Sequence, residues 1–513
     1  MSASEQRSPD VGLPGVVESA QSVALRETLG AAAAAEPGLR HIVCHVDQYE
    51  ELLAAKVFRA GAVLDQVAAL GPPPCTATPV VLEVHRSQSS HFRQRVDLWV
   101  RSDVNEALPG AELFYAMAPT TTTTATAGLG SSCAVEAAEP EPEPEPLPSG
   151  GSSGERQPGT ASRLAGVRLE GFPVASVRVN TLMEQLMTKL NAAAAGSTLR
   201  HRLYEARFLT TLRGAGPQLV TLIYHRKLGP GWEEEARLLS SALGCSIVGR
   251  SRGQKIVVGQ DWVEEELRVS AAPIGRESTQ ESRAETAHAD ETTGQASSGS
   301  VFRYRHAENG FSQPNGAVCE KMLDFALSCT AGKSLGSSDL LELYCGNCNF
   351  TAPLARHRFR RVLATEISGP SVELARHNLR ANGCTNATVV RASAEEVASA
   401  LQAGAAQLES LVAARLSEGE GAAPDTVLRL GQGAQGAGAE GAGAASPPPS
   451  SVQLRQLRTL LVDPPRSGLD PVIIEMARRH FRWVIYISCN TCSMLRDIEA
   501  LAEGRELTLH HFA

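Results

Sequence analysis

Three short stretches of this sequence end an apolar run with side chains that can do chemistry. They are LLELYCGNCNF at 340–350, LLVDPPRSGLD at 460–470 and VIYISCNTC at 484–492. Each apolar run has the length of a β-strand and breaks into Gly, Pro, Asn or Cys, so each would present polar groups at the carboxyl end of its strand. Because ligands of open α/β sheets bind at that edge, the stretches predict one shared site.

The first stretch has features of a site for a nucleotide-like ligand. Gly346 follows the strand and lets a ligand approach the backbone closely. The turn lacks the three-glycine pattern of dinucleotide sites and the GK[ST] sequence of phosphate loops, which disfavours NAD and ATP. Glu366 ends the next apolar run, 22 residues after Tyr344, where an acidic residue would accept hydrogen bonds from both ribose hydroxyls of an adenosine cofactor. An ordinary acidic residue before a helix is the alternative for Glu366.

The second and third stretches carry groups suited to a base and to a nucleophile. Pro464 and Pro465 make a rigid edge for a flat base, beside which Asp463 can accept a hydrogen bond and Arg466 can pair with a phosphate. Cys489 ends the third strand, where a base, a helix N-terminus or a cation would favour its thiolate. Cysteine is most often a small buried residue, but the polar Ser-Cys-Asn break favours a nucleophile here.

Two CxxC pairs offer a rival interpretation, a four-cysteine zinc site. They are Cys345 with Cys348 and Cys489 with Cys492. The pairs lie about 140 residues apart, and each ends a core strand instead of forming a hairpin. We therefore expect no metal.

The elements that must position these groups alternate between strands and helices from residue 301 on. Serial strand–helix units predict a parallel sheet with helices on both faces. Strands are expected at 339–344, 361–366, 387–391, 458–462 and 483–488, and helices after Pro314, from Phe350, and at 370–382, 393–401, 471–480 and 493–503.

The N-terminal half has a different pattern, in which strand-like runs are separated by turns and by helices near 49–66 and 231–243. This pattern predicts a small antiparallel α+β domain. Its bases lie near strand ends and would form a phosphate-contacting face, with Phe92 or Phe172 available to stack on a base. Ordinary charged strand edges are the alternative. The bases are Arg93, Arg95, Arg213, His225, Arg226, Lys227, Arg250, Arg252 and Lys255.

Composition divides the chain. Residues 1–40 form a loose tail, and three stretches have the composition of disordered, solvated chain: 120–158, 271–300 and 402–450. These three hold sixteen acidic and five basic residues, so the net charge of −8 becomes about +3 without them. A slightly basic folded part is compatible with a polyanionic partner. We expect an N-terminal domain at 41–270, a linker at 271–300 and a second domain at 301–513.

Cysteine usage and hydropathy indicate the compartment. The eleven cysteines are too scattered for a disulfide framework, and no apolar run reaches membrane-spanning length. The acidic residues among the first forty disfavour a transit peptide. We expect a soluble monomer in a reducing compartment, the cytoplasm or an organelle, with no membrane contact.

Together, these stretches closely resemble the TrmA-type tRNA uracil-5-methyltransferases. The resemblance is dense in FSQPN at 311–315, in the three stretches above and in RVLATEIS at 361–368, and it is thinner in HFRQR, FPVAS and the run from FLTTL to YHRKL. It implies a Rossmann-like class I S-adenosylmethionine-dependent methyltransferase domain, preceded by a smaller antiparallel α+β RNA-binding domain. The implied substrate is the T-loop uridine of tRNA, methylated at C5.

The resemblance also implies roles for single residues. Cys489 matches the nucleophile that adds to C6 of the uracil, and Asp463 would lie beside both the cofactor and the target base. Phe172 matches the aromatic residue that displaces a base, and Arg93, Arg95 and Arg466 would contact RNA. The cofactor S-adenosylmethionine would be held by Gln313, Tyr344, Asn349 and Glu366.

The sequence departs from the family pattern at three places. Cys348 stands where the family has the second glycine of its turn, and Thr491 stands where it has a proline. No residue matches the glutamate, in a DQFPYTHHMECG-like segment, that takes the C5 proton. His510 and His511 are better explained as the end of a strand. We therefore expect the chain as given to form the covalent adduct and to release it poorly.

Two alternatives stay open. The first is an rRNA uridine-5-methyltransferase, although the early cysteines Cys44, Cys75 and Cys133 lack the clustering of an iron–sulfur site. The second is a protein that binds or refolds RNA without catalysis.

Overall fold

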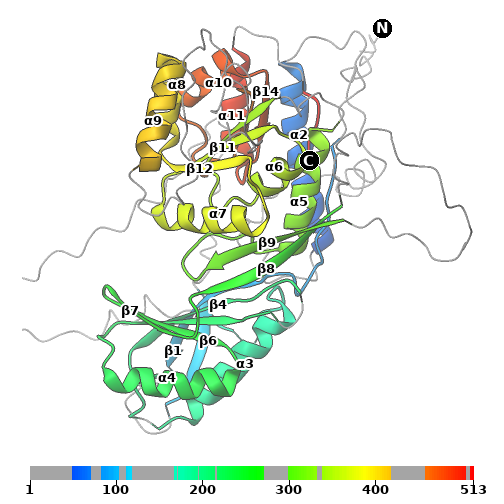
Figure 1. The fold of residues 1–513 in the computed structure, drawn as a ribbon. Coiled ribbons are helices and arrows are strands. Elements are labelled where there is room, and N and C mark those ends of the chain that lie inside the picture. The colour runs from blue at the N-terminus through cyan, green and yellow to red at the C-terminus, as the bar shows by residue number, and fades with distance from the viewer. Residues whose placement is uncertain are drawn as a thin grey trace, which may run out of the picture.

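The computed structural model describes residues 49–70, 82–102, 111–117, 167–169, 171–194, 196–213, 216–270, 299–331, 338–417, 457–503 and 509–513. The predicted tail 1–40, the predicted insert 120–158, nearly all of the linker 271–300 and residues 418–450 of the last insert lie outside the described residues. Figure 1 shows two lobes, with a parallel sheet in the upper lobe and a larger sheet below it.

The upper, parallel-sheet lobe contains a five-stranded sheet with the order β12-β11-β10-β13-β14. All four strand pairs are parallel, so the predicted parallel sheet is confirmed. The strand order reverses between β10 and β13, and their carboxyl ends therefore flank the crevice in which such sheets bind ligands. The strands are β10 (Asp339–Leu343), β11 (Arg361–Glu366), β12 (Ala387–Arg391), β13 (Leu457–Val462) and β14 (Trp483–Tyr486).

Helices cover both faces of this sheet, and all five residues of β10 are buried as a result. One face packs against α5 (Gly316–Cys329), α6 (Thr351–His357) and α7 (Gly369–Ala381). The other face packs against α8 (Ala394–Ala403), α9 (Ala405–Ser417), α10 (Pro471–His480) and α11 (Thr491–Ala502).

Helix α9 corrects one expectation, because it occupies residues that were predicted to begin the disordered insert 402–450. Leu408 and Val412 are buried in the core below it, four residues apart and so on one side of the helix. The high Ala and Gly content of 402–450 as a whole concealed this short apolar period.

The N-terminal lobe contains a seven-stranded sheet with the order β3-β2-β1-β4-β5-β6-β7. It is antiparallel, as expected, except that β5 and β6 are parallel. The exception follows from α4 (Pro230–Leu243), which carries the chain back so that β6 starts at the same end as β5. The strands are β1 (Arg95–Ser102), β2 (Leu113–Met117), β3 (Val167–Arg168), β4 (Leu203–Leu209), β5 (Leu219–Tyr224), β6 (Ser246–Ser251) and β7 (Gln254–Val258).

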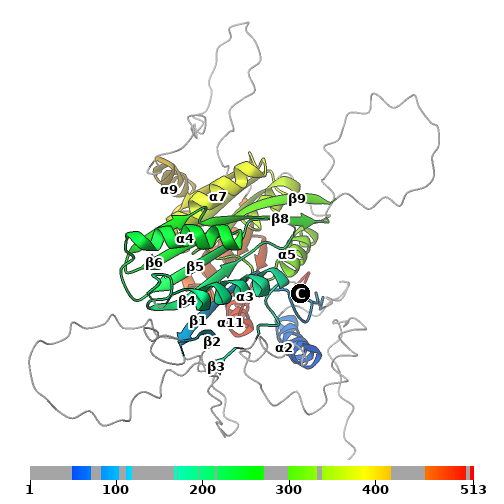
Figure 2. The ribbon, with the colours of Figure 1, turned by 90° about the horizontal axis from the view of Figure 1, so that it is seen from below.

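One face of this sheet is covered by α4 and by α3 (Val177–Ala192), which lie in front of the strands in Figure 2. Val96, Leu98 and Val100 of β1 point into this core, and each has 2% of its surface exposed. The strand therefore alternates between a buried face and a face that looks away from the helices.

One strand pair joins the lobes, and one helix crosses the predicted domain boundary. The antiparallel pair β8 (Trp262–Val269) and β9 (Ser300–Ala307) lies between the two sheets in Figure 1. Helix α2 (Tyr49–Ala69) belongs to the range predicted for the N-terminal domain, but it packs against α11 of the parallel-sheet lobe. The predicted domain boundaries themselves stay predictions.

Candidate active site

The turn after β10 has an unusual backbone. Tyr344, Gly346 and Cys348 all have positive φ, of 62°, 55° and 68°. Cys348 pays a conformational cost that glycine would avoid, but its side chain is fully buried in the core and does not project from the turn. A Cβ atom added to Gly346 would meet no atom within 4 Å among the described residues, so open space lies beside this glycine.

Glu366 closes this turn from the neighbouring strand. Its Oε2 accepts a hydrogen bond from the Gly346 backbone N–H at 3.1 Å, and its Oε1 accepts from the Ser368 N–H at 2.8 Å. The second contact is the helix-start role that was considered as the alternative, and the first ties the carboxylate to the glycine turn. Each carboxylate oxygen has two acceptor positions, so both oxygens can accept further hydrogen bonds.

Strand β9 supports the turn from below, which no sequence motif indicated. The Tyr304 hydroxyl donates to the Asn349 carbonyl at 2.9 Å, and Asn347 Nδ2 donates to His306 Nδ1 at 3.0 Å. Burial lowers the pKa of His306 to about 3, so its ring is neutral and can accept this bond. Asn378 of α7 completes the support by donating from Nδ2 to the Asn347 carbonyl at 2.9 Å.

The two remaining candidate cofactor residues lie near the start of α5. The side chain of Asn349 contacts Cys319 Sγ, with 3.3 Å between Nδ2 and the sulfur. Gln313 is half-buried in the segment that precedes the helix. Gln94, which precedes β1, fixes that segment because its backbone N–H donates to the Pro314 carbonyl and its Oε1 accepts from the Gly316 N–H, both at 2.8 Å.

Two carboxyl groups lie near each other on adjacent strands at this edge. Burial raises the pKa of Asp463, which follows β13, to about 6. Glu342 of β10 is 1% exposed, and its pKa is raised to about 8 by burial and by the negative charge of Asp463. Its Oε2 atom has no hydrogen-bond partner among the described residues. Glu342 was not among the residues predicted from the sequence, although an acidic residue inside an apolar strand is a visible signal.

Cys489 is exposed between β14 and α11. The next residue, Asn490, caps α11 by accepting from the Cys492 N–H at 3.1 Å through Oδ1. Cys489 therefore directly precedes the N-cap of a twelve-residue helix. Asn490 Nδ2 also donates to the Arg466 carbonyl at 2.9 Å, which ties the cysteine turn to the Asp-Pro-Pro-Arg loop.

A second tie between these two loops was also missed by the sequence analysis. Asp497 of α11 is fully buried, and its Oδ2 accepts from the Leu469 N–H at 2.6 Å and from the Tyr486 hydroxyl at 2.7 Å. Arg496 donates from Nη2 to the Ser467 carbonyl at 2.7 Å. The loop 463–470 and the turn 488–490 thus form one hydrogen-bonded unit. We call the carboxyl ends of β10, β11, β13 and β14 the carboxyl edge. This edge carries Tyr344, Glu366, Asp463 and Cys489.

The candidate RNA-contacting residues are more scattered. Arg466 is exposed at the carboxyl edge. Arg93 donates from Nε to the Arg95 carbonyl at 2.8 Å, and Arg95 donates from Nη2 to the Ala307 carbonyl at 2.9 Å, across the junction of the lobes. Phe172 is 4% exposed and packs in the core of the N-terminal lobe, so its ring does not face solvent in this structure. Its role as a base-displacing residue stays a prediction.

The four cysteines of the rival zinc interpretation lie in different surroundings. Cys345 and Cys348 are buried in the core, whereas Cys489 and Cys492 are exposed. No group of three or more His, Cys, Asp or Glu side chains suited to a metal ion occurs within the described ranges. In the same ranges, no helix is long and apolar enough to cross a membrane.

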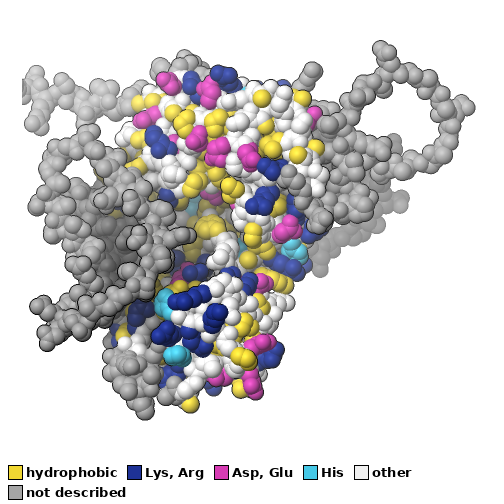
Figure 3. Space-filling model, turned by 90° about the vertical axis from the view of Figure 1, so that its left-hand side faces the viewer, with side chains coloured by type: hydrophobic (Ala, Val, Ile, Leu, Met, Phe, Trp, Pro, Cys, Tyr) yellow, Lys and Arg dark blue, Asp and Glu magenta, His cyan; other side chains and the backbone are white. Residues whose placement is uncertain are grey.

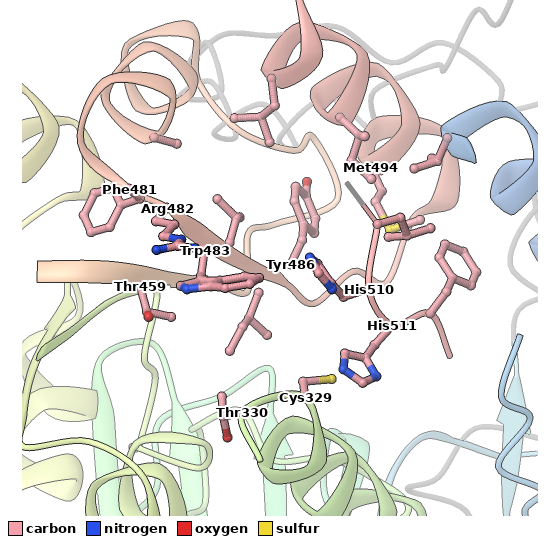
Figure 4. Close-up of a pocket in the computed structure, with 18 of the residues that line it drawn as sticks. Cys329, Thr330, Thr459, Phe481, Arg482, Trp483, Tyr486, Met494, His510 and His511 are labelled. Carbon is pink, nitrogen blue, oxygen red and sulfur yellow. The ribbon is translucent and has the colours of Figure 1, made fainter. Parts of the chain in front are cut away.

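A cavity of about 470 Å³ lies beside β14 and is separate from the carboxyl edge. Figure 4 shows His510, His511 and Trp483 around it. The His510 ring lies 5.0 Å from the Trp483 ring, at the start of β14. Trp483 begins β14, whereas Cys489 lies beyond the other end of that strand.

Comparison with known proteins gives the family. The family model described as tRNA (Uracil-5-)-methyltransferase matches residues 160–287, 273–417 and 451–511. Three curated relatives are named tRNA/tmRNA (uracil-C(5))-methyltransferase. The protein of Ectopseudomonas mendocina is 40% identical over 67% of this chain and 74% of its own length. The protein of Chromohalobacter salexigens is 35% identical over 91% of this chain and 91% of its own length. The protein of Acinetobacter baylyi is 32% identical over 90% of this chain and 92% of its own length.

Proposed function

The chain belongs to the tRNA (uracil-5-)-methyltransferase family, and on that basis we propose that it methylates C5 of a T-loop uridine in tRNA, with Cys489 as the covalent nucleophile. S-adenosylmethionine-dependent tRNA uracil methylation is the family's activity. The observation that carries the assignment of the nucleophile is the position of Cys489. It is exposed at the N-terminus of α11, in a turn bonded to the loop that starts with Asp463.

The carboxyl edge suits S-adenosylmethionine. The space beside Gly346 is open to a ligand, and the neighbouring Glu366 carboxylate keeps acceptor positions for ribose hydroxyls. Gln313, Tyr344 and Asn349 would complete the cofactor site. When bound, this cofactor supplies an electrophilic methyl carbon on a positively charged sulfur.

Cys489 would activate the base by addition. Uracil C5 is a poor nucleophile, and a bond from the Cys489 thiolate to C6 moves the electron pair of the C5–C6 double bond toward C5 and the C4 carbonyl. C5 would then take the methyl group of the cofactor, as the methyl–sulfur bond breaks and its electron pair stays on the sulfur. Loss of the C5 proton to a base would restore the double bond as the sulfur–C6 bond breaks and Cys489 leaves as a thiolate. Because no residue matches the family's glutamate, we expect this last step to be slow in this chain.

Asp463 would hold the uracil during this sequence. Its carboxylate can accept the N3–H of the base, while Pro464 and Pro465 keep the loop rigid beside it. The base must leave the RNA stack to reach this loop, which costs least for a nucleotide that is already in a loop. Arg466 is exposed and would pair with a phosphate of the displaced nucleotide.

The test uses full-length tRNA, S-adenosylmethionine, the wild-type chain and the variant Cys489→Ala. We expect 5-methyluridine, measured by mass spectrometry of digested tRNA, and a protein–RNA adduct that survives denaturing electrophoresis. Cys489→Ala should lose both signals, by a factor of at least about 1,000 in rate, and should bind tRNA within about twofold of the wild type. Exposed Cys492→Ala is the matched control and should keep both.

Two results would contradict the proposal. Methylation that survives in Cys489→Ala would remove the covalent mechanism. Binding of tRNA without methylation or adduct in the wild type would favour an RNA-binding protein without catalysis. Methylation of an rRNA fragment in preference to tRNA would change the substrate but keep the chemistry.

A further inference from the structure

The face of the N-terminal sheet that points away from α3 and α4 carries aromatic and basic side chains. Along β1, Arg95, Asp97, Trp99 and Arg101 alternate with the buried residues of the core. The strand register sets Phe114 of β2 opposite Arg101, and Arg168 of β3 opposite Ala116, the partner of Trp99. These residues therefore share one face of three adjacent strands.

On this face and beside it, at the start of β4 and just after β5, three aromatic rings each lie against a cationic or titratable side chain. The Arg101 guanidinium lies 4.7 Å from the centre of the Trp99 ring, and that of Arg168 lies 4.8 Å from the Phe114 ring. The Tyr204 and His225 rings are stacked, with 3.8 Å between their centres and 13° between their planes. Arg101 also donates to the Tyr204 carbonyl at 3.2 Å, which links the pairs. We call this set the aromatic shelf: Trp99, Arg101, Phe114, Arg168, Tyr204 and His225.

The surroundings of the aromatic shelf are basic. Glu205, opposite Trp99, is bound by Arg207 at 2.6 Å, and Glu112 is bound by Arg168 at 3.0 Å. Figure 3 shows Lys and Arg side chains gathered on the N-terminal lobe, with histidines beside them. Exposed bases near the start of β4 and the ends of β5 and β6 are His201, Arg202, Lys227 and Arg252.

The aromatic shelf leads toward the junction with the parallel-sheet lobe. Arg95, at the start of β1 and on the same face, contacts the Ala307 carbonyl of β9. Trp99 and Arg101 lie four and six residues farther along the strand, roughly 13–20 Å from that junction. An RNA that crosses this junction along β1 would therefore meet the shelf.

We propose that the aromatic shelf binds the substrate RNA outside the methylated loop, by stacking bases on its rings and guanidinium planes and by attracting phosphates. Single-stranded or splayed bases stack on aromatic rings and on arginine planes, and each ring–cation pair presents such a surface. The basic surroundings match the charge of a phosphate backbone. The proposal rests on the proposed function, since it takes tRNA as the partner.

The test measures the affinity of full-length tRNA without S-adenosylmethionine, so that it does not depend on methylation. Stacking of one base predicts that Trp99→Leu weakens binding roughly 5- to 150-fold. Trp99→Phe keeps a ring and should restore most of the affinity. Arg101→Gln should weaken tRNA binding. It should also make the slope of log affinity against log salt concentration shallower by about one released ion.

Arg237→Gln is the matched control, because Arg237 lies on α4, on the other side of the sheet, with 66% of its side chain exposed. Unchanged tRNA affinity in both Trp99→Leu and Arg101→Gln would overturn the proposal, as would an equal loss in Arg237→Gln. Thermal unfolding shows whether Trp99→Leu is misfolded. If it is, the tRNA affinities of Arg101→Gln and Trp99→Phe decide whether the shelf binds RNA. If the shelf variants weaken tRNA binding but the wild type never methylates tRNA, the proposed function is wrong and the RNA-binding role of the shelf is still supported.

Discussion

The carboxyl edge and the aromatic shelf hold their polar groups in opposite ways. At the carboxyl edge, Glu366 accepts from two backbone N–H groups, and the buried Asp497 accepts from the Leu469 N–H and the Tyr486 hydroxyl. On the shelf, partly exposed rings and guanidinium groups contact one another, and the neighbouring Arg168–Glu112 ion pair is open to solvent.

This difference teaches what each surface can do. Buried hydrogen bonds fix atoms to within a fraction of an ångström, which a reaction requires. Solvent-exposed ring and ion pairs contribute less, about 1 kcal/mol or below, and they can rearrange around a ligand. We therefore expect changes at the carboxyl edge to alter kcat and stability, and changes on the shelf to alter affinity.

The largest effect of a conservative change is expected for Asp463→Asn. The amide keeps the size of the side chain but loses the negative charge that accepts the uracil N3–H, so kcat should fall roughly 100- to 1,000-fold. Affinity for tRNA should stay within about twofold. Radiolabelled methyl transfer and filter binding measure the two quantities.

The pH profile supplies the control for this variant. Because burial raises the pKa of Asp463 to about 6, the wild-type rate should show a rising step as the pH passes through about 6 and the carboxylate forms. Asp463→Asn should lack that step. If Asp463→Asn kept the wild-type kcat and lost tRNA affinity instead, the carboxyl edge would behave as the shelf is expected to, and the distinction between the two surfaces would be wrong.

The next effect concerns the tie between the catalytic loops. Asp497→Ala leaves the Leu469 N–H and the Tyr486 hydroxyl without their acceptor in a buried place, so the free energy of unfolding should fall by about 2–4 kcal/mol. Arg101→Gln, on the aromatic shelf, should cost about 1 kcal/mol or less. Urea titration of both variants measures the contrast, and equal losses would show that the shelf is as rigidly held as the edge.

Much of the fold and part of the site followed from sequence. The five strands of the parallel sheet, and the meeting of Tyr344, Glu366, Asp463 and Cys489 at their carboxyl ends, were predictable. The reason is that parallel strands place the residues that follow them at one edge. Helix α9 was missed because its apolar period is short within an Ala- and Gly-rich stretch.

What the sequence did not reveal are contacts between distant residues. Asp497, His306 and Asn378 support the reactive turns from other elements, and no local motif announces a hydrogen bond to a backbone group far away in the chain. The bases near strand ends were noticed, but their pairing was not. Arg95 bonds to β9 instead of facing solvent, whereas Arg101, which was not among those bases, lies over Trp99.

The smallest predicted effect concerns Glu342, the buried carboxyl group under the carboxyl edge. Its pKa is raised by burial from 4.5 to about 8, so the folded protein holds this proton at pH values where the unfolded chain has lost it. The stability that this proton provides is complete below pH 4.5 and is lost as the pH rises through 8. Asp463, whose pKa is raised to about 6, also makes the protein less stable as the pH rises, but its loss of stability ends near pH 6.

Glu342→Gln isolates the upper part of this dependence, because the amide resembles the protonated carboxyl and does not titrate. Relative to the wild type, the variant should gain at least about 1 kcal/mol of unfolding free energy between pH 5 and pH 9. Asp463→Asn should instead remove the decline between about pH 4 and 6. Urea titrations at four pH values separate the two windows. If Glu342→Gln and the wild type differed equally at pH 5 and pH 9, Glu342 would carry no native proton, and the edge would owe its pH dependence to Asp463 alone.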